Sequence, residues 1–149
     1  MKTRLYISIA FILAMTLLLG SCTYGHIEDT NGDDTTVVQI SDKDIIGSTS
    51  HTATLASKSR VDDSFTYNVR SLSGVYILGK HNVESGELTI NMSTVLMAGN
   101  LRICVIKDGN IAADIPIGEN QTLTLEGNGL YEIKLAAESA RLSINYSIK

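Results

Sequence analysis

The sequence predicts an all-β fold: an antiparallel β-sandwich, Ig-like or jelly-roll-like, of about 7–9 short strands. Three observations lead to this prediction. Apolar and polar residues alternate over much of the chain after His51, which is typical of strands with one buried face. Two further runs are apolar on both faces, and turn residues recur about every ten residues.

The segment before the predicted sheet has the pattern of an export signal. Lys2 and Arg4 are followed by a stretch from Leu5 to Leu19 that contains no charged residue. A basic start and a roughly 15-residue apolar stretch are typical of secretory signals, and the stretch is shorter than the roughly 20 residues of a spanning helix. We therefore expect residues 1–21 to be removed.

The end of this signal resembles the lipobox of bacterial lipoproteins. Leu19-Gly20-Ser21-Cys22 has the apolar residue, the two small residues and the cysteine of that motif. The resemblance implies cleavage before Cys22, a diacylglyceryl group on its sulfur and acylation of its new amine. Two or three acyl chains form a durable anchor. The chain is thus expected to be lipid-anchored at the cell envelope, in the outer membrane, and an ordinary secretory signal is the alternative.

The segment after Cys22 is polar and acidic. Such a composition cannot bury enough surface to become ordered, so we expect residues 22–45 to form a flexible tether and residues 46–149 to form the domain. Its acids resemble the surface-export signal of Bacteroidetes lipoproteins, although they begin later than in that signal, and a solvated spacer is the alternative. These acids are Glu28, Asp29, Asp33 and Asp34.

Six segments predict the strands. Four alternate between apolar and polar residues and should be half-buried, whereas two are apolar throughout and should be central. The alternating segments are residues 65–69, 88–92, 131–135 and 142–148, and the apolar ones are residues 75–78 and 103–106.

Turn residues stand between these segments. Asp108-Gly109 favours the left-handed conformations of a tight hairpin. Pro116 donates no ladder hydrogen bond and indicates an edge strand or a strand end. Residues 135–142 contain good helix formers, but the alternation on both sides favours a turn at Ala137-Glu138-Ser139. The other predicted turns are Ser73-Gly74, Glu84-Ser85-Gly86, Ala98-Gly99-Asn100, Gly118-Glu119-Asn120 and Gly127-Asn128-Gly129.

Charge and cysteine content exclude several functions. The chain carries a formal net charge of −4, and loss of Lys2 and Arg4 makes the mature part more acidic. It therefore lacks the clustered bases that nucleic acid requires and any polybasic run for anionic lipid. With Cys22 lipidated, Cys104 has no intrachain disulfide partner. Its apolar neighbours indicate a buried, inert thiol, and a reactive cysteine is the alternative.

No group of residues predicts catalysis or a metal site. Asp62-Asp63 should be a solvated turn, and the three histidines, His26, His51 and His81, lack metal-ligand spacing. The segment Asp29-Thr30-Asn31-Gly32-Asp33 begins like a calcium loop, but Asp34 and Ile40 replace its required glycine and glutamate. There is also no nucleophile elbow or phosphate loop. We expect no enzyme activity and no cofactor.

Residues 65–148 resemble small β-sandwich modules of bacterial surface proteins. The resemblance lies in residues 86–90, in Lys107-Asp108-Gly109 and in residues 129–133, and it implies a fold without an active site. We expect an interaction or accessory module that contacts an envelope protein or a glycan through loops or a sheet edge. The alternative is a carbohydrate-binding surface lipoprotein, which an exposed pair of tyrosines would favour because aromatic rings stack on sugars.

Overall fold

The computed structural model describes residues 38–149, which form one antiparallel sheet of seven strands and a short helix. The predicted all-β antiparallel fold is confirmed. The elements are α2 (Asp42–Gly47), β1 (His51–Thr54), β2 (Ser57–Val61), β3 (Ser64–Val83), β4 (Glu87–Lys107), β5 (Asn110–Ile115), β6 (Gln121–Glu126) and β7 (Gly129–Ile148). Within this range no helix is long and apolar enough to cross a membrane.

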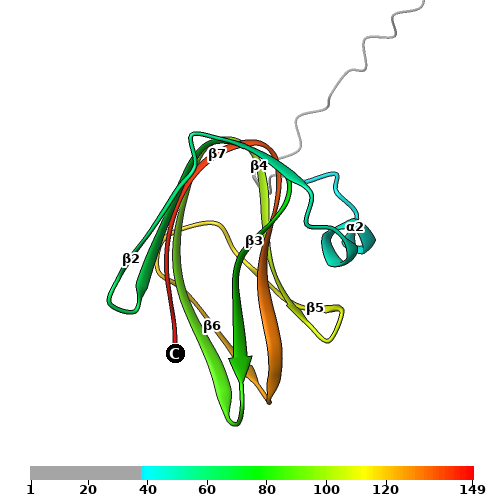
Figure 1. The fold of residues 1–149 in the computed structure, drawn as a ribbon, viewed down its shortest axis with the longest axis vertical. Coiled ribbons are helices and arrows are strands. Elements are labelled where there is room, and N and C mark those ends of the chain that lie inside the picture. The colour runs from blue at the N-terminus through cyan, green and yellow to red at the C-terminus, as the bar shows by residue number, and fades with distance from the viewer. Residues whose placement is uncertain (1–37) are drawn as a thin grey trace, which may run out of the picture. The chain divides into compact units, whose positions relative to one another are not determined.

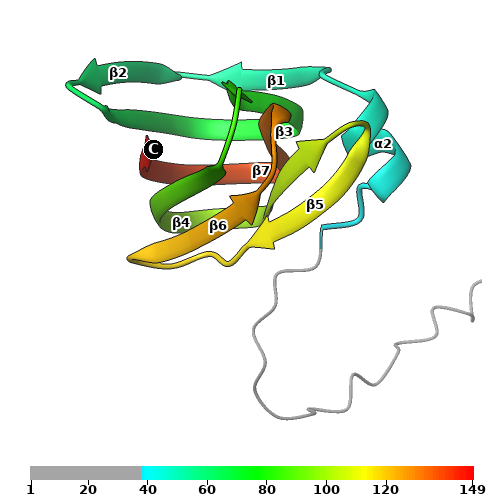
Figure 2. The ribbon, with the colours of Figure 1, turned by 90° about the horizontal axis from the view of Figure 1, so that it is seen from below.

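Three long strands form the middle of the sheet. The order is β1-β3-β7-β4-β5, with β2 paired to the first part of β3 and β6 to the first part of β4. Figure 2 shows the long strands between β1 and β2 on one side and β5 and β6 on the other. The strands are 20, 21 and 20 residues long, so the expectation of short strands is wrong for β3, β4 and β7.

Each long strand contains two of the predicted segments. Segments 65–69 and 75–78 lie in β3, segments 88–92 and 103–106 in β4, and segments 131–135 and 142–148 in β7. The predicted turns at Ser73-Gly74, Ala98-Gly99-Asn100 and Ala137-Glu138-Ser139 are therefore wrong. They are bends within continuous strands, and the long strands arch over at this point at the top of Figure 1.

The bend has a local backbone cause. The register shifts near Gly74 and Gly99, and both glycines have positive φ angles, 97° and 75°. Ser139 of β7 also has a positive φ of 52°. Bulges use the same left-handed conformations as tight turns, so glycine alone does not distinguish them.

The bend folds the sheet onto itself and creates a sandwich-like core. Side chains from the two halves of β3, β4 and β7 meet between them, and the sheet is not closed. The largest of these buried side chains are Tyr67, Leu72, Leu78, Leu88, Ile90, Met92, Leu101, Ile103, Tyr131, Ile133 and Leu135.

The other predicted turns agree with the structure. Residues 84–86 join β3 to β4, Asp108-Gly109 joins β4 to β5, and residues 127–128 join β6 to β7. Pro116 directly follows the last residue of β5, as expected of a strand end. Asp62 and Asp63 form the turn between β2 and β3 and are exposed.

Helix α2 covers the outer face of one half-sheet, beside β5 (Figure 1). Ile45 is fully buried there against Val75, Cys104, Ile106 and Ala136. This second cluster explains why residues 75–78 and 103–106 are apolar on both faces. The helix straddles the expected boundary between residues 45 and 46, so residues 42–45 belong to the folded part.

Candidate interaction site

The folded sheet is open on one side, between β2 and the second half of β3. There β1 pairs only with Ser71–Gly74 of β3 and β2 only with Ser64–Asn68, so residues 76–83 of β3 pair only with β7. Their other backbone edge faces the opening. Lys58 of β2 crosses it, donating a hydrogen bond of 2.5 Å to the carbonyl oxygen of Leu78.

A cleft of about 430 Å³ lies at this opening. Its floor is a stacked pair of rings, Phe65 and Tyr146, whose centroids are 5.0 Å apart. The Tyr146 hydroxyl donates to the Leu78 carbonyl at 3.2 Å, which fixes that ring in the core. We call the space lined by Lys58, Arg60, Phe65, Gly79, His81 and Tyr146 the edge cleft.

Two cations lie over the aromatic floor of the edge cleft. The Lys58 ammonium is 5.8 Å from the centroid of Phe65, and the Arg60 guanidinium is 5.1 Å from it. Such distances are typical of cation–π contacts. Burial lowers the pKa of Lys58, but both side chains keep unused N–H donors. Asp63 at the rim lies 3.7 Å from Arg60 in an exposed pair that contributes little.

The rim of the cleft is fixed by a further ion pair. Lys80, next to Gly79, pairs with Glu132 of β7, and this contact is the main reason that the pKa of Glu132 is lowered. Lys80 is thus already neutralised. Lys58 and Arg60 remain as the charges that a ligand would meet, so the edge cleft favours an anionic group.

A second surface lies on the outside of the other half-sheet and is polar but uncharged. Directly paired residues of antiparallel strands point to the same face, and three rows of such residues cross β2, β3, β7 and β4. The rows are Ser57, Asn68, Ser143 and Val95; Ser59, Thr66, Asn145 and Ser93; and Val61, Ser64, Ser147 and Asn91. We call this the hydroxyl–amide face.

Hydrogen bonds between neighbouring side chains hold this face in place. Thr66 donates to Asn145 at 2.8 Å, and Thr122 of β6 donates to Asn91 at 2.9 Å. Hydroxyl and amide groups offer both donors and acceptors at the strand spacing of about 4.8 Å. The face therefore suits a neutral ligand with many hydroxyl groups.

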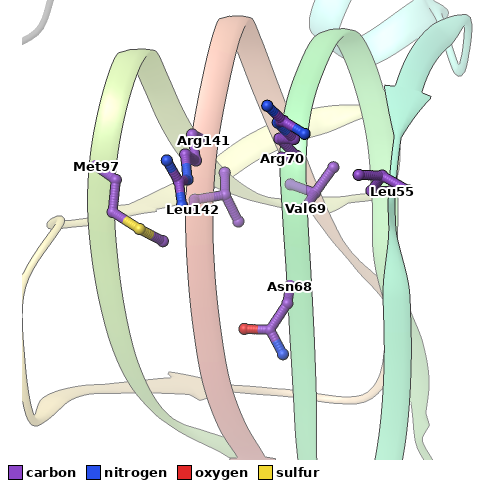
Figure 3. A pocket seen from close by; sticks show the side chains of 7 residues that line it. All are labelled: Leu55, Asn68, Val69, Arg70, Met97, Arg141 and Leu142. Carbon is purple, nitrogen blue, oxygen red and sulfur yellow. The ribbon is translucent and has the colours of Figure 1, made fainter.

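A third surface, which we call the bend surface, lies where the long strands turn over. Figure 3 shows Met97, Arg141, Arg70 and Leu55 in a line across the strands. They surround a hollow of about 320 Å³. Val69 and Leu142 form its base, and both belong to the core.

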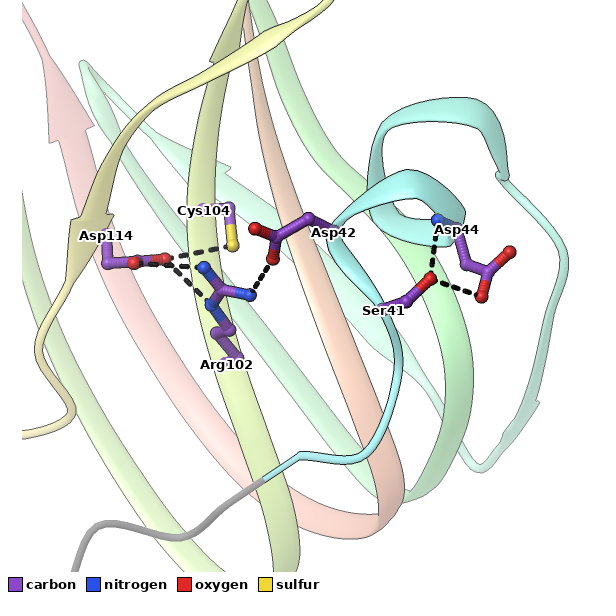
Figure 4. A network of polar contacts seen from close by, with 6 residues as sticks. All are labelled: Ser41, Asp42, Asp44, Arg102, Cys104 and Asp114. Atoms are coloured by element: carbon purple, nitrogen blue, oxygen red, sulfur yellow. Dashed lines mark hydrogen bonds and ion pairs between the residues drawn. The ribbon is translucent and has the colours of Figure 1, made fainter.

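A polar network attaches α2 to the sheet (Figure 4). Arg102 of β4 contacts Asp42 at 2.5 Å and Asp114 of β5 at 3.0 Å. The Cys104 thiol donates to the same Asp114 carboxylate at 3.1 Å. Burial, followed by this hydrogen bond, raises the pKa of Cys104 to about 12. The thiol is fully buried and protonated at neutral pH, as expected of an inert cysteine.

The structure does not gather the other candidate residues into a site. His51 packs edge-on against Tyr76, and His81 lines the edge cleft. Among residues 38–149 no group of three or more histidine, cysteine or acidic side chains could hold a metal. Cys22, His26 and the calcium-like segment 29–33 lie outside the described residues. Tyr67, Tyr131 and Tyr146 are buried in the core, so they offer no exposed tyrosine pair.

The cations of the edge cleft were not predicted from the sequence. Lys58 and Arg60 belong to β2, in which all five residues are exposed and only Val61 is apolar. The alternation in this strand is between charged and small side chains, which a search for apolar periodicity does not detect.

No protein-family model matches the chain, and no curated protein is detectably similar to it.

Proposed function

We propose that this chain is a lipid-anchored, non-catalytic interaction module of the cell envelope, which binds an extended acidic segment of a partner protein at the edge cleft. The proposal is supported most directly by one relationship: the unpaired edge of residues 76–83 lies beside Lys58 and Arg60. The Leu78 carbonyl already accepts from Lys58 and Tyr146, and the other N–H and C=O groups on this side of residues 76–83 can accept another strand. The cations would then select a strand with carboxylates on the side facing the cleft.

The anchor in this proposal is the lipidated Cys22, which the lipobox resemblance supports. The outer membrane is its proposed location. Binding through a sheet edge requires no catalytic group.

The test is a titration of the full chain with a peptide of alternating glutamate and valine, followed by NMR. We expect the backbone amides of residues 76–83 to shift and the double variant Lys58→Gln/Arg60→Gln to bind at least about tenfold more weakly, as loss of two charge-assisted contacts implies. A peptide with glutamine in place of glutamate should bind like that variant. Unchanged amide signals at 76–83 would refute the proposal.

The matched control is Arg70→Gln/Arg141→Gln. It removes the same number of positive charges from the bend surface and should leave binding of the acidic peptide unchanged. Equal weakening by both double variants would mean that the peptide responds to overall charge and not to the edge cleft.

The second candidate is a carbohydrate-binding surface lipoprotein, and the hydroxyl–amide face favours it. A neutral glycan could hydrogen-bond to its rows of side chains without aromatic stacking. A glycan array tests this candidate: binding that Thr66→Ala/Asn145→Ala reduces and Asn128→Ala does not would support it. An array without binding would remove it.

A further inference from the structure

We propose that the bend surface docks onto an anionic phospholipid bilayer, so that the anchored protein has a fixed orientation with the edge cleft away from the membrane. This inference rests on the proposed lipid anchor at Cys22. It adds a second contact with the membrane, made by the folded domain itself.

The bend surface carries exposed apolar side chains. The described residues contain five large apolar side chains that are strongly exposed, and three of them lie at or beside the bend: Leu55 (71%), Val95 (51%) and Met97 (50%). Leu55 also has a positive φ of 50°, which is unfavourable for a bulky residue. An exposed and strained leucine suggests that the surface is covered in use.

The bend surface is also positively charged. Arg70 of β3 and Arg141 of β7 lie between Leu55 and Met97 (Figure 3), and neither forms an ion pair with any residue from 38 to 149. Guanidinium groups bind phosphate in a bidentate manner. Cations flanked by apolar side chains match the interface of an anionic bilayer. The cations contact the headgroups, and the apolar side chains enter the boundary of the acyl chains.

The first described residues lie at the bend, because the backbone N–H of Gln39 donates to the Glu138 carboxylate at 2.8 Å. The described part of the chain thus begins at this end of the domain. Cys22 lies sixteen positions before Val38, so this end of the domain is the part nearest to the proposed anchor along the chain.

The opposite end of the strands is less suited to an anionic surface. Each of its turns contains or adjoins an acid, at Asp62, Glu84, Asp108 and Glu126, and of these four only Asp108 has a lysine, Lys107, directly beside it in the sequence. Docking through the bend would direct these turns away from the bilayer. The edge cleft would then remain accessible to a partner.

The test uses the full lipidated chain in vesicles of phosphatidylethanolamine and phosphatidylglycerol, with a spin label at Met97→Cys. Because Cys104 is buried and Cys22 carries the lipid, the label reacts at one position. We expect the label at 97 to become accessible to oxygen and protected from a water-soluble relaxant. A label at Val61→Cys, which is 72% exposed and distant from the bend, is the control and should remain in water.

Two comparisons test whether the arginines and the anionic lipid are both needed for docking. Each arginine should change the ratio of docked to undocked protein by roughly fivefold, as expected for a basic residue near an anionic surface, so Arg70→Gln/Arg141→Gln should lower it by more than tenfold. Vesicles of phosphatidylcholine alone should lower the ratio of docked to undocked protein by the same factor.

Equal accessibility of the labels at 97 and 61 on protein that stays attached to anionic vesicles would overturn the docking proposal while leaving the anchor intact. Protein that carries no lipid and does not stay with the vesicles would instead overturn the anchor on which the proposal rests.

Discussion

Lys134 Nζ donates a hydrogen bond of 2.8 Å to the carbonyl oxygen of Ile46, which joins the first half of β7 to the last turn of α2. The same ammonium also donates to the carbonyls of Ile45 and Ser48. Lys134 is only 2% exposed. A buried lysine thus satisfies carbonyl groups at the end of the helix that would otherwise have no partner.

Substitution Lys134→Met should destabilise the domain, because methionine keeps the aliphatic volume but leaves the helix carbonyls unpaired in a buried place. We expect the free energy of unfolding, measured with urea, to fall by about 2–3 kcal/mol. Lys43→Met, on the exposed side of the same helix, is the control and should change it by less than about 0.5 kcal/mol. Equal effects would show that the three carbonyl contacts do not matter.

Gly99→Ala should disrupt the bend. A Cβ atom at Gly99 would lie 2.5 Å from the carbonyl oxygens of both Glu138 and Ser139, and the φ of 75° is itself unfavourable for alanine. We expect a loss of about 3 kcal/mol or more in urea denaturation. Gly109→Ala separates the two causes, since Gly109 has a similar φ of 73° and nothing within 4 Å. Gly109→Ala should lower the free energy of unfolding by only about 1 kcal/mol.

Leu55→Asn should leave the domain as stable as the wild type or stabilise it, because asparagine tolerates the positive φ of this position better than leucine. The expected gain is up to about 1 kcal/mol. Thermal unfolding of the full chain measures it. A clear loss of stability would mean that Leu55 contributes to packing despite its exposure.

Stability should decrease in alkaline solution. Burial raises the pKa of Cys104 to about 12 and, as the main cause in each case, also raises those of Tyr67 and Tyr146 to about 12. Between the ordinary values near 9–10 and about 12 the unfolded chain binds fewer protons than the folded chain, so the free energy of unfolding falls as pH rises. Urea denaturation from pH 8 to pH 11 measures this slope, and Cys104→Ala should reduce it. A flat profile would contradict the burial of these groups.

The sequence predicted the strands with apolar periodicity but not their continuity. Segments 65–69 and 75–78 lie in the two halves of β3. Gly74, which lies between them, has a positive φ and belongs to a bulge within the strand, where a turn was expected. The bulge at Gly74 and the hairpin turn at Gly109 have the same local backbone preference, because both glycines have a positive φ. Only the pairing of β3 with strands from distant parts of the chain determines that the backbone at Gly74 forms a bend and not a turn.

The elements without apolar periodicity could not be predicted in this way. Every residue of β1 and β2 is exposed, so no hydrophobic pattern identifies these strands or the cations of the edge cleft. Lys134 alternates with Ile133 and Leu135 as a solvated residue would, and only the position of α2 makes it buried. The bend surface combines Arg70 with Arg141, which are far apart in the sequence and give no basic cluster there.

We propose above all that Cys22 holds this module at a membrane. The most direct measurement is the intact mass of the mature protein extracted from cell membranes. We predict a chain that begins at Cys22 and carries a diacylglyceryl group and an amide-linked acyl chain, and Cys22→Ala should abolish both the lipid and membrane retention. A mature chain without lipid, or a Cys22→Ala variant that remains lipid-labelled and membrane-bound, would contradict this account.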